Sequence, residues 1–215
     1  GTNPDNLGTS GDELVEANFR AAGTLADPMV TVRDDQVAGP GNMLYRLRDF
    51  QGFDTINLET LAGDDEIRVV GRDDGSLTVN VDAGLPDGSD TLRFDVTNGN
   101  DSYTITPGAS NDAGTILVSL DGAATTTVNF SNTEAIDIDQ LSLHANSGDG
   151  GNDAITIGGT GGDDMFTLAA FDNDEGLAQV NAGPTIRFNE LVANFGVGTG
   201  TIDINGLGGD DRLDV

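Results

Sequence analysis

The sequence contains no cysteine, no tryptophan and no lysine, and it has a single histidine. Without cysteine, the chain can form neither a disulfide framework nor a reactive thiolate. All nine basic residues are arginine, and 37 acidic residues give a formal net charge of −28. Because nucleic-acid backbones and anionic membrane surfaces repel such a chain, we expect neither as a partner.

Aromatic residues and long apolar runs are also scarce. Aromatic side chains make up 5% of the chain and hydrophobic residues 36%, which predicts a thin, aliphatic core. No apolar run approaches the ~20 residues that a membrane-spanning helix needs, so we expect no membrane insertion. The first residue is glycine, and no apolar targeting segment follows it. This beginning predicts a processed protein or a piece of a longer one.

Glycine and aspartate are the abundant residue types. The chain has 31 glycines and only six prolines, which indicates many turns rather than disorder. Of the 37 acidic residues, seven are glutamate and the remaining 30 are aspartate. A high-salt surface can use either acid, whereas aspartate suits turns and short-armed metal ligation. We therefore interpret the excess of aspartate mainly as a consequence of turn formation, and only second as an adaptation to a high-salt habitat.

A Gly-x-Asp turn followed by a short alternating apolar strand recurs along the chain. Asp153 precedes one such strand, and Asp164, eleven residues later, precedes the next. A glycine two residues before each aspartate permits the turn, and the period of two places one strand face in a core. The same offset of eleven recurs at Asp54 and Asp65, at Asp90 and Asp101, and at Gly200 and Asp211, where the first aspartate is lost.

Further short strand patterns lie between these paired turns and divide the chain into long units of residues 8–97, 98–158 and 159–215. Repeats on this scale indicate a solenoid, a propeller or an array. The best helix candidate is the single segment Asp12–Ala22. We therefore predict an all-β chain, with residues 1–215 forming one continuous parallel β-solenoid, similar to a right-handed β-helix or β-roll, with irregular inserted loops. A β-sandwich array is the main alternative.

Stacked turns of this kind bring equivalent aspartates together. Neighbouring strands lie ~4.8 Å apart, and two unit charges at ~5 Å repel by roughly 3 kcal/mol at an effective dielectric near 20. Carboxylate and carbonyl oxygens suit Ca²⁺ better than Mg²⁺, and one histidine without cysteine disfavours zinc. Glycine-aspartate pairs are also ordinary turn formers, so acidic turns that bind no metal are the alternative.

Three segments resemble the hemolysin-type calcium-binding (RTX) nonapeptide Gly-Gly-x-Gly-x-Asp-x-apolar-x: 148–156 (GDGGNDAIT), 159–167 (GTGGDDMFT) and 206–214 (GLGGDDRLD). In that family, the aspartate binds Ca²⁺ between adjacent turns of a parallel β-roll. The copies here are paired at eleven rather than tandem at nine, which favours a broader β-helix with local sites. The resemblance implies calcium as the bound ion, with ligands among Asp54, Asp64, Asp65, Asp90, Asp101, Asp153, Asp163, Asp164, Asp210 and Asp211.

Catalytic patterns are few. His144 has no recognisable nucleophile motif nearby. The acid pairs Asp73/Asp74 and Asp172/Asp174 are candidates for glycoside hydrolysis, but two tyrosines and no tryptophan suggest no catalytic cleft with aromatic platforms. We therefore expect a protein that is not an enzyme.

The leading functional prediction is a calcium-binding extracellular structural repeat module of a surface fibre, filament, matrix or adhesin protein. The alternatives are a carbohydrate-binding or carbohydrate-active β-helix, and a calcium-dependent secretion segment of a larger toxin or hydrolase. No polar cap is evident at either end of the repeats, so we expect head-to-tail self-association through open solenoid ends. Glycans or a cell surface are further candidate partners.

Overall fold

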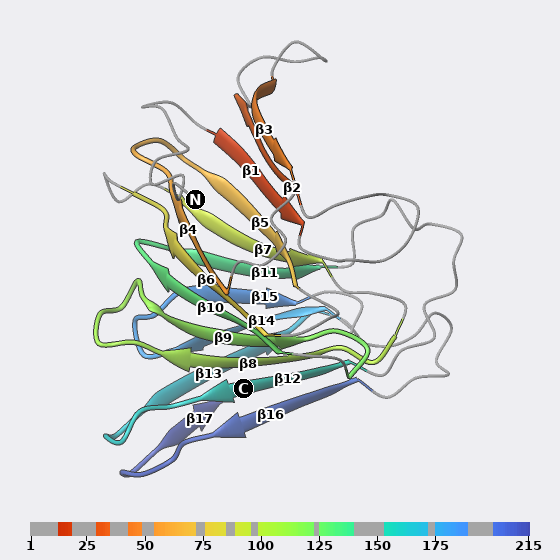
Figure 1. Cartoon of the computed structure of the whole chain (residues 1–215). Helices are drawn as coiled ribbons and strands as arrows, with labels where there is room; N and C mark the ends of the chain where they lie inside the picture. The colour runs from red at the N-terminus through yellow and green to blue at the C-terminus, as the bar shows by residue number, and fades with distance from the viewer. Residues whose placement is uncertain are drawn as a thin grey trace.

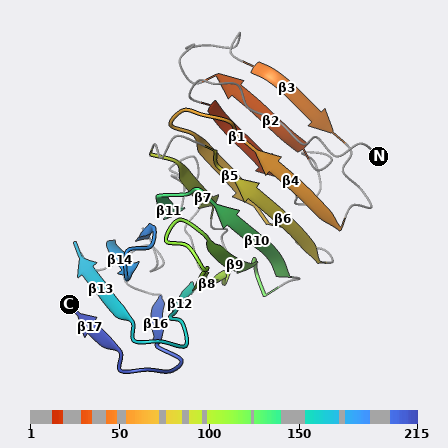
Figure 2. The ribbon, with the colours of Figure 1, turned by 90° about the vertical axis from the view of Figure 1, so that its left-hand side faces the viewer.

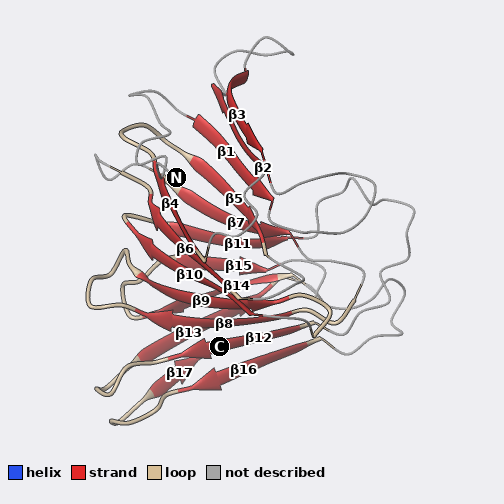
Figure 3. Ribbon diagram, in the orientation of Figure 1, coloured by secondary structure: helices blue, strands red, loops and turns tan. Residues whose placement is uncertain are grey.

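The computed structural model describes residues 13–18, 29–34, 43–48, 54–71, 76–84, 89–95, 99–122, 125–139, 153–171, 175–188 and 200–215. All regular structure in these residues is β-strand (Figure 3). No helix in this part of the chain could cross a membrane. The helix candidate Asp12–Ala22 is wrong, because Glu13–Asn18 is a strand that pairs with strands on both sides. Its apolar residues Val15 and Ala17 alternate and are buried, which is the period of a strand.

The strands form two sheets that lie face to face (Figures 1 and 2). The seven-stranded sheet contains, in spatial order, β16 (Thr201–Asn205), β12 (Ala154–Gly158), β8 (Ser102–Pro107), β9 (Gly114–Ser119), β10 (Thr125–Ser131), β6 (Leu77–Asp82) and β4 (Thr55–Glu59). The ten-stranded sheet contains, in spatial order, β17 (Arg212–Asp214), β13 (Met165–Ala170), β14 (Gly176–Val180), β15 (Thr185–Phe188), β11 (Ala135–Asp139), β7 (Thr91–Asp95), β5 (Glu66–Val70), β1 (Glu13–Asn18), β2 (Met29–Asp34) and β3 (Met43–Arg48).

The paired turns at an offset of eleven mark crossings between the sheets. Strands are found where the pattern predicts them, and this prediction is confirmed. The two strands of each pair belong to different sheets: β4 and β5, β7 and β8, β12 and β13, and β16 and β17. The turn of the last pair lies directly on its neighbour, since Gly209 has φ of 115° and a Cβ there would clash with the Gly162 carbonyl oxygen. Only glycine tolerates both constraints.

The predicted parallel β-solenoid is wrong, although the all-β class is right. Both sheets are mixed, because three antiparallel meanders interrupt their parallel pairing: β1-β2-β3, β8-β9-β10 and β13-β14-β15. Neither sheet is closed by the strands that the structure describes. Between β9 and β10, Asp121 and Gly122 have φ of 55° and 68°. Positive φ at successive residues favours a tight hairpin, whose twist matches that of its strands. Each meander therefore keeps three consecutive strands in one sheet, whereas a solenoid would advance the chain by one coil.

The core fills the space between the two sheets. It is mostly aliphatic, as predicted, with buried isoleucine, leucine and valine from both sheets. Within the core, Phe94 of β7 meets Tyr103 of β8 edge to face, with ring centroids 5.9 Å apart and planes at 61°. Both side chains are fully buried. Because these strands belong to different sheets, this ring pair is a direct contact across the core.

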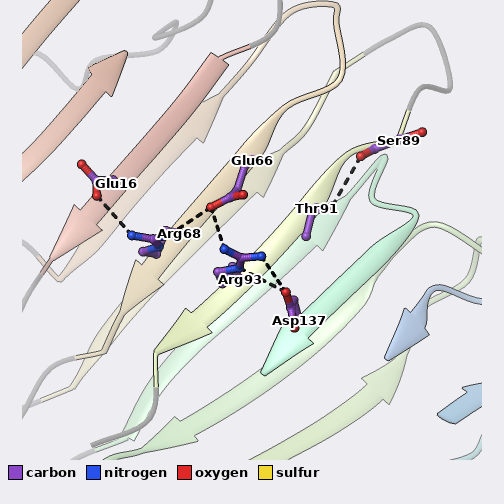
Figure 4. A network of polar contacts seen from close by, with 7 residues as sticks. All are labelled: Glu16, Glu66, Arg68, Ser89, Thr91, Arg93 and Asp137. Carbon is purple, nitrogen blue, oxygen red and sulfur yellow. Dashed lines mark hydrogen bonds and ion pairs between the residues drawn. The ribbon is translucent and has the colours of Figure 1, made fainter. Parts of the chain in front are cut away.

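The outward face of the ten-stranded sheet carries a row of ion pairs (Figure 4). Arg68 of β5 contacts Glu16 of β1 at 3.3 Å and Glu66 of its own strand at 3.2 Å. Arg93 of β7 contacts Glu66 at 3.3 Å and Asp137 of β11 at 2.8 Å. Both arginines therefore brace carboxylates on neighbouring strands. Four adjacent strands are thereby linked on one face.

Candidate functional site

The ten acidic residues singled out from the sequence fall into two groups of five. Asp54, Asp64, Asp163, Asp210 and Asp211 are exposed to solvent. The other five precede strands and are buried, with at most 3% of their surface exposed: Asp65, Asp90, Asp101, Asp153 and Asp164. Burying a carboxylate is costly unless hydrogen bonds or opposite charges compensate it, so the second group requires a physical reason.

Hydrogen bonds between neighbouring strands compensate much of the cost of burying these carboxylates. The backbone N–H of Asp65 donates to Asp90 Oδ1 at 2.7 Å, and that of Asp101 donates to Asp153 Oδ1 at 2.9 Å. The N–H of Asp164 likewise donates to Asp211 Oδ1 at 3.0 Å. The short aspartate side chain thus spans the gap between two strands and satisfies a backbone donor at the strand start. This arrangement explains the choice of aspartate without any metal.

Equivalent aspartates do lie on neighbouring strands, but they do not form one column. They separate into a group at the start of β5, β7 and β11, a group at β8 and β12, and a group at β13 and β17. Within the described residues, no three acidic or histidine side chains converge into a ready-made metal-binding group. The three groups also differ in how fully their carboxylates are hydrogen-bonded.

Asp164 is well supplied with donors. Thr160 donates to it through its backbone N–H at 2.7 Å and through Oγ1 at 3.1 Å, and Asn181 Nδ2 donates at 2.7 Å. Burial by itself raises the pKa of Asp164, but the hydrogen bonds from Thr160 and Asn181 outweigh it and hold the pKa below its ordinary value of 3.8. This carboxylate is therefore stably ionised by the protein alone.

Asp90 has the opposite environment. Its Oδ1 accepts the Asp65 N–H, but among the residues that the structure describes nothing donates to the buried Oδ2. The pKa of Asp90 is raised from 3.8 to about 7, chiefly by burial, and the hydrogen bond from Asp65 opposes this rise only in part. The negative charges of Asp65, Glu134 and Asp64 contribute smaller parts of the same rise. A buried carboxylate surrounded by three other acids is a site that lacks positive charge.

We call Asp64, Asp65, Asp90 and Glu134 the Asp90 cluster. Its members come from the starts of β5, β7 and β11, and the Asp90 N–H donates to Glu134 Oε2 at 3.0 Å. Asp64 is exposed and accepts the Ser89 N–H at 3.2 Å, so the cluster opens to solvent on one side. Glu134 was not among the residues predicted from the sequence. Its position before the alternating strand β11 repeats that of Asp90 before β7, and this was the available signal.

The candidate catalytic residues His144, Asp73/Asp74 and Asp172/Asp174 lie outside the described residues. Comparison of the chain with protein-family models, with curated proteins and with solved structures finds no match. Its function therefore has to be inferred from its own residues.

Proposed function

We propose that this chain is a calcium-binding structural module of an extracellular assembly, such as a surface fibre, filament, matrix or adhesin. The observation that carries the proposal is the buried Asp90 Oδ2, which accepts no hydrogen bond from any described residue and lies among the charges of three further acids. A bound cation would replace both the missing donor and the proton that otherwise neutralises this carboxylate near pH 7.

The chemistry of the Asp90 cluster suits calcium. Its side-chain donors are all carboxylate oxygens, and Ca²⁺ accepts six to eight oxygens in adaptable geometry, including backbone carbonyls and water. A site assembled from short aspartates on adjacent strands leaves room for water ligands, which weak extracellular calcium modules commonly use. The ligands that we propose are Asp90 with Asp64, Asp65 and Glu134. Their carboxylates do not converge on one point in this structure, so they would have to move together to hold the ion. Asp101, Asp153 and Asp164 then serve as hydrogen-bond acceptors between strands.

Calcium is expected to raise the melting temperature of the chain at pH 7.5. A ligand at 100 times its Kd stabilises a folded protein by about 2.7 kcal/mol, which corresponds to roughly 5–10 °C for a chain of this size. Circular dichroism melts in calcium, in magnesium at equal ionic strength and in excess chelator would measure the effect. A melting temperature that is the same in calcium and in chelator would remove calcium from the proposal.

An uncovered end of the sheets supports the assembly part of the proposal. β16 and β17 are the outermost strands of their sheets (Figure 2). The core-facing Leu213 of β17 is 49% exposed, whereas Phe166, its register partner on β13, is 2% exposed. On β16, Ile202 is only partly buried, whereas its partner Ile155 is fully buried. A strand edge with an open core beneath it is a template for pairing with another chain.

A second copy of the chain is the occupant that we propose for this end. β4 and β16 lie at opposite edges of the seven-stranded sheet and run in the same direction. The β16 edge of one copy can therefore meet the β4 edge of the next with the parallel polarity that the sheet already has. Such head-to-tail contacts repeat without closing and produce filaments. A net charge of −28 opposes them, so cations should promote association.

Replacing Leu213 with aspartate is expected to prevent this association. In sedimentation velocity with calcium, the mean mass of the parent chain should rise with concentration, while Leu213→Asp should stay monomeric because a charge then faces the interface. Leu117→Asp is the control, because Leu117 is 41% exposed on the outward face of β9, away from both sheet edges. Self-association that Leu213→Asp leaves unchanged would exclude this end as the contact.

A further inference from the structure

Three neighbouring strands of the seven-stranded sheet carry the same outward-facing pattern. It reads TINLE in β4 (55–59), TVNVD in β6 (78–82) and TVNFS in β10 (127–131). The apolar residues at the second and fourth positions are buried in the core, so the other three positions point outward. The strands pair in parallel register, which aligns the pattern in three rows across the sheet. We call the asparagines and the residues two positions after them the polar array.

The asparagine row is held in place by its own hydrogen bonds. Asn80 Nδ2 donates to Asn57 Oδ1 at 2.8 Å, and Asn129 Nδ2 donates to Asn80 Oδ1 at 2.8 Å. The hydroxyl of Thr115, on the adjacent β9, donates to Asn129 Oδ1 at 3.1 Å. A side-chain amide has two N–H donors and two acceptor positions on its oxygen. Within the described part of the chain, Asn80 uses one of each in the row, so its remaining donor and acceptor are available to a ligand.

The second row of the polar array is acidic at two of its three positions. Glu59 of β4 lies beside Asp82 of β6, and Ser131 of β10 follows Asp82 on its other side. Asp82 is fixed in orientation, because Asn132 Nδ2 donates to its Oδ1 at 2.6 Å and the Gly84 N–H donates at 3.3 Å. The two rows together place carboxylate, hydroxyl and amide groups side by side at strand spacing.

These two rows line an open groove of about 410 Å³. This volume is within the range of small-molecule sites in proteins. Its lining contains six polar residues and no basic one: Asn57, Glu59, Asn80, Asp82, Asn129 and Ser131. The outward face of the other sheet instead carries arginine-carboxylate pairs (Figure 4). The neutral and acidic groups of the groove thus face solvent on a surface of distinct chemistry.

We propose that this groove binds a neutral glycan chain. Adjacent sugar hydroxyls act as both donors and acceptors, and they match the oriented amides of the asparagine row and the acceptors Glu59 and Asp82. The row repeats every ~4.8 Å across the strands, which provides successive equivalent contacts for a ligand that is itself a chain of repeating units. The absence of basic residues from the lining disfavours anionic polysaccharides. This inference does not depend on the calcium site.

Titration with neutral oligosaccharides tests the proposal. The probes are hexasaccharides of β-linked glucose, α-linked glucose and α-linked mannose, added to the ¹⁵N-labelled chain while side-chain amide NMR signals are followed. At least one probe is expected to shift the signals of Asn57, Asn80 and Asn129. Asn80→Ala is expected to weaken its binding at least tenfold, because it interrupts the row. Asp82→Asn, which keeps the shape of the side chain, tests the acidic row if Asn80→Ala does not fold.

Asn205→Ala is the matched control, because Asn205 lies on β16 of the same sheet, outside the groove. It is expected to leave glycan affinity unchanged. The proposal is overturned if no probe shifts the asparagine signals at tens of millimolar, or if Asn205→Ala weakens binding as much as Asn80→Ala. Shifts caused by calcium at Glu59 and Asp82, with none caused by a glycan, would also overturn it and identify the groove as a cation site.

Discussion

The variant Asp90→Asn is expected to be more stable than the parent chain at pH 8 without calcium, and less stable than the parent at saturating calcium. The asparagine oxygen can still accept the Asp65 N–H, so the hydrogen bond between β5 and β7 is kept. The buried charge among Asp65, Glu134 and Asp64 is removed. The substitution therefore separates the cost of this charge from the hydrogen bond that the residue makes.

The pH dependence of the metal-free chain follows from the raised pKa of Asp90. In the unfolded chain this carboxyl ionises near 3.8, and in the folded chain near 7. Between these values the folded state binds the proton more tightly than the unfolded state does. The free energy of unfolding therefore falls as pH rises from about 4 to about 7, and it falls no further above pH 7. One pKa unit corresponds to about 1.4 kcal/mol. Allowing for screening by water at the open side of the cluster, we expect a loss of about 2 kcal/mol.

Urea unfolding at pH 5 and pH 8, with chelator and with calcium, would measure both effects. The control is Asp164→Asn, which replaces an equivalent buried aspartate whose pKa is lowered. Asp164 stabilises the fold above pH 3.8 and loses this contribution as pH falls through its lower folded-state pKa, so its replacement should destabilise the chain at neutral pH. If Asp90→Asn and Asp164→Asn changed the free energy of unfolding in the same direction at pH 8 in chelator, the account of the Asp90 cluster would be wrong.

Replacing Phe94 with alanine is expected to destabilise the fold by about 4 kcal/mol, because truncating a fully buried aromatic ring leaves a cavity that the surroundings fill only in part. Phe94 is fully buried and contacts Tyr103 across the two sheets. With few aromatic residues in the chain, no neighbouring ring can move into the space without leaving another. Urea unfolding followed by circular dichroism, at fixed calcium and pH, would give the free energy of unfolding.

Phe171→Ala is the matched control for this prediction. Phe171 is 57% exposed, so its truncation removes little buried surface and should change stability by less than about 0.5 kcal/mol. Equal losses of stability in the two variants would contradict this prediction, because the buried and the exposed ring would then contribute alike. A large loss at Phe94 alone would show that the burial of this ring between the two sheets stabilises the fold.

The strand positions could be predicted from the sequence because their signals are local. Asp54 and Asp65, like Asp153 and Asp164, each stand between a glycine turn and an alternating apolar segment, and a strand begins directly after each. The hairpins had a local signal too, since Asp121-Gly122 is a favoured hairpin turn. The repeats alone indicated that the chain always advances to a new coil, so the meanders were not predicted.

The candidate site could be predicted only in part. The sequence singled out the aspartates that precede strands, but it gave Asp90 and Asp164 the same role. Their environments differ because Thr160 and Asn181 donate to Asp164, while Asp90 meets Asp65 and Glu134. The repeated T-x-N pattern of β4, β6 and β10 was present in the sequence, but a pattern of alternate residues does not tell which strands lie side by side.

By itself, the sequence determined that this chain is all-β, that its core is aliphatic, and that short acidic turns precede its strands. These properties depend on glycine φ angles, on the period of two and on side-chain composition, all of which act over a few residues. Only the tertiary structure decided the direction of strand pairing, the division into two sheets, and which carboxylates are hydrogen-bonded and which are not. Asp65 and Glu134 are 69 residues apart in the sequence and meet at Asp90 because β5, β7 and β11 are neighbours. Contacts at that separation depend on how the whole chain packs, and no local pattern encodes them.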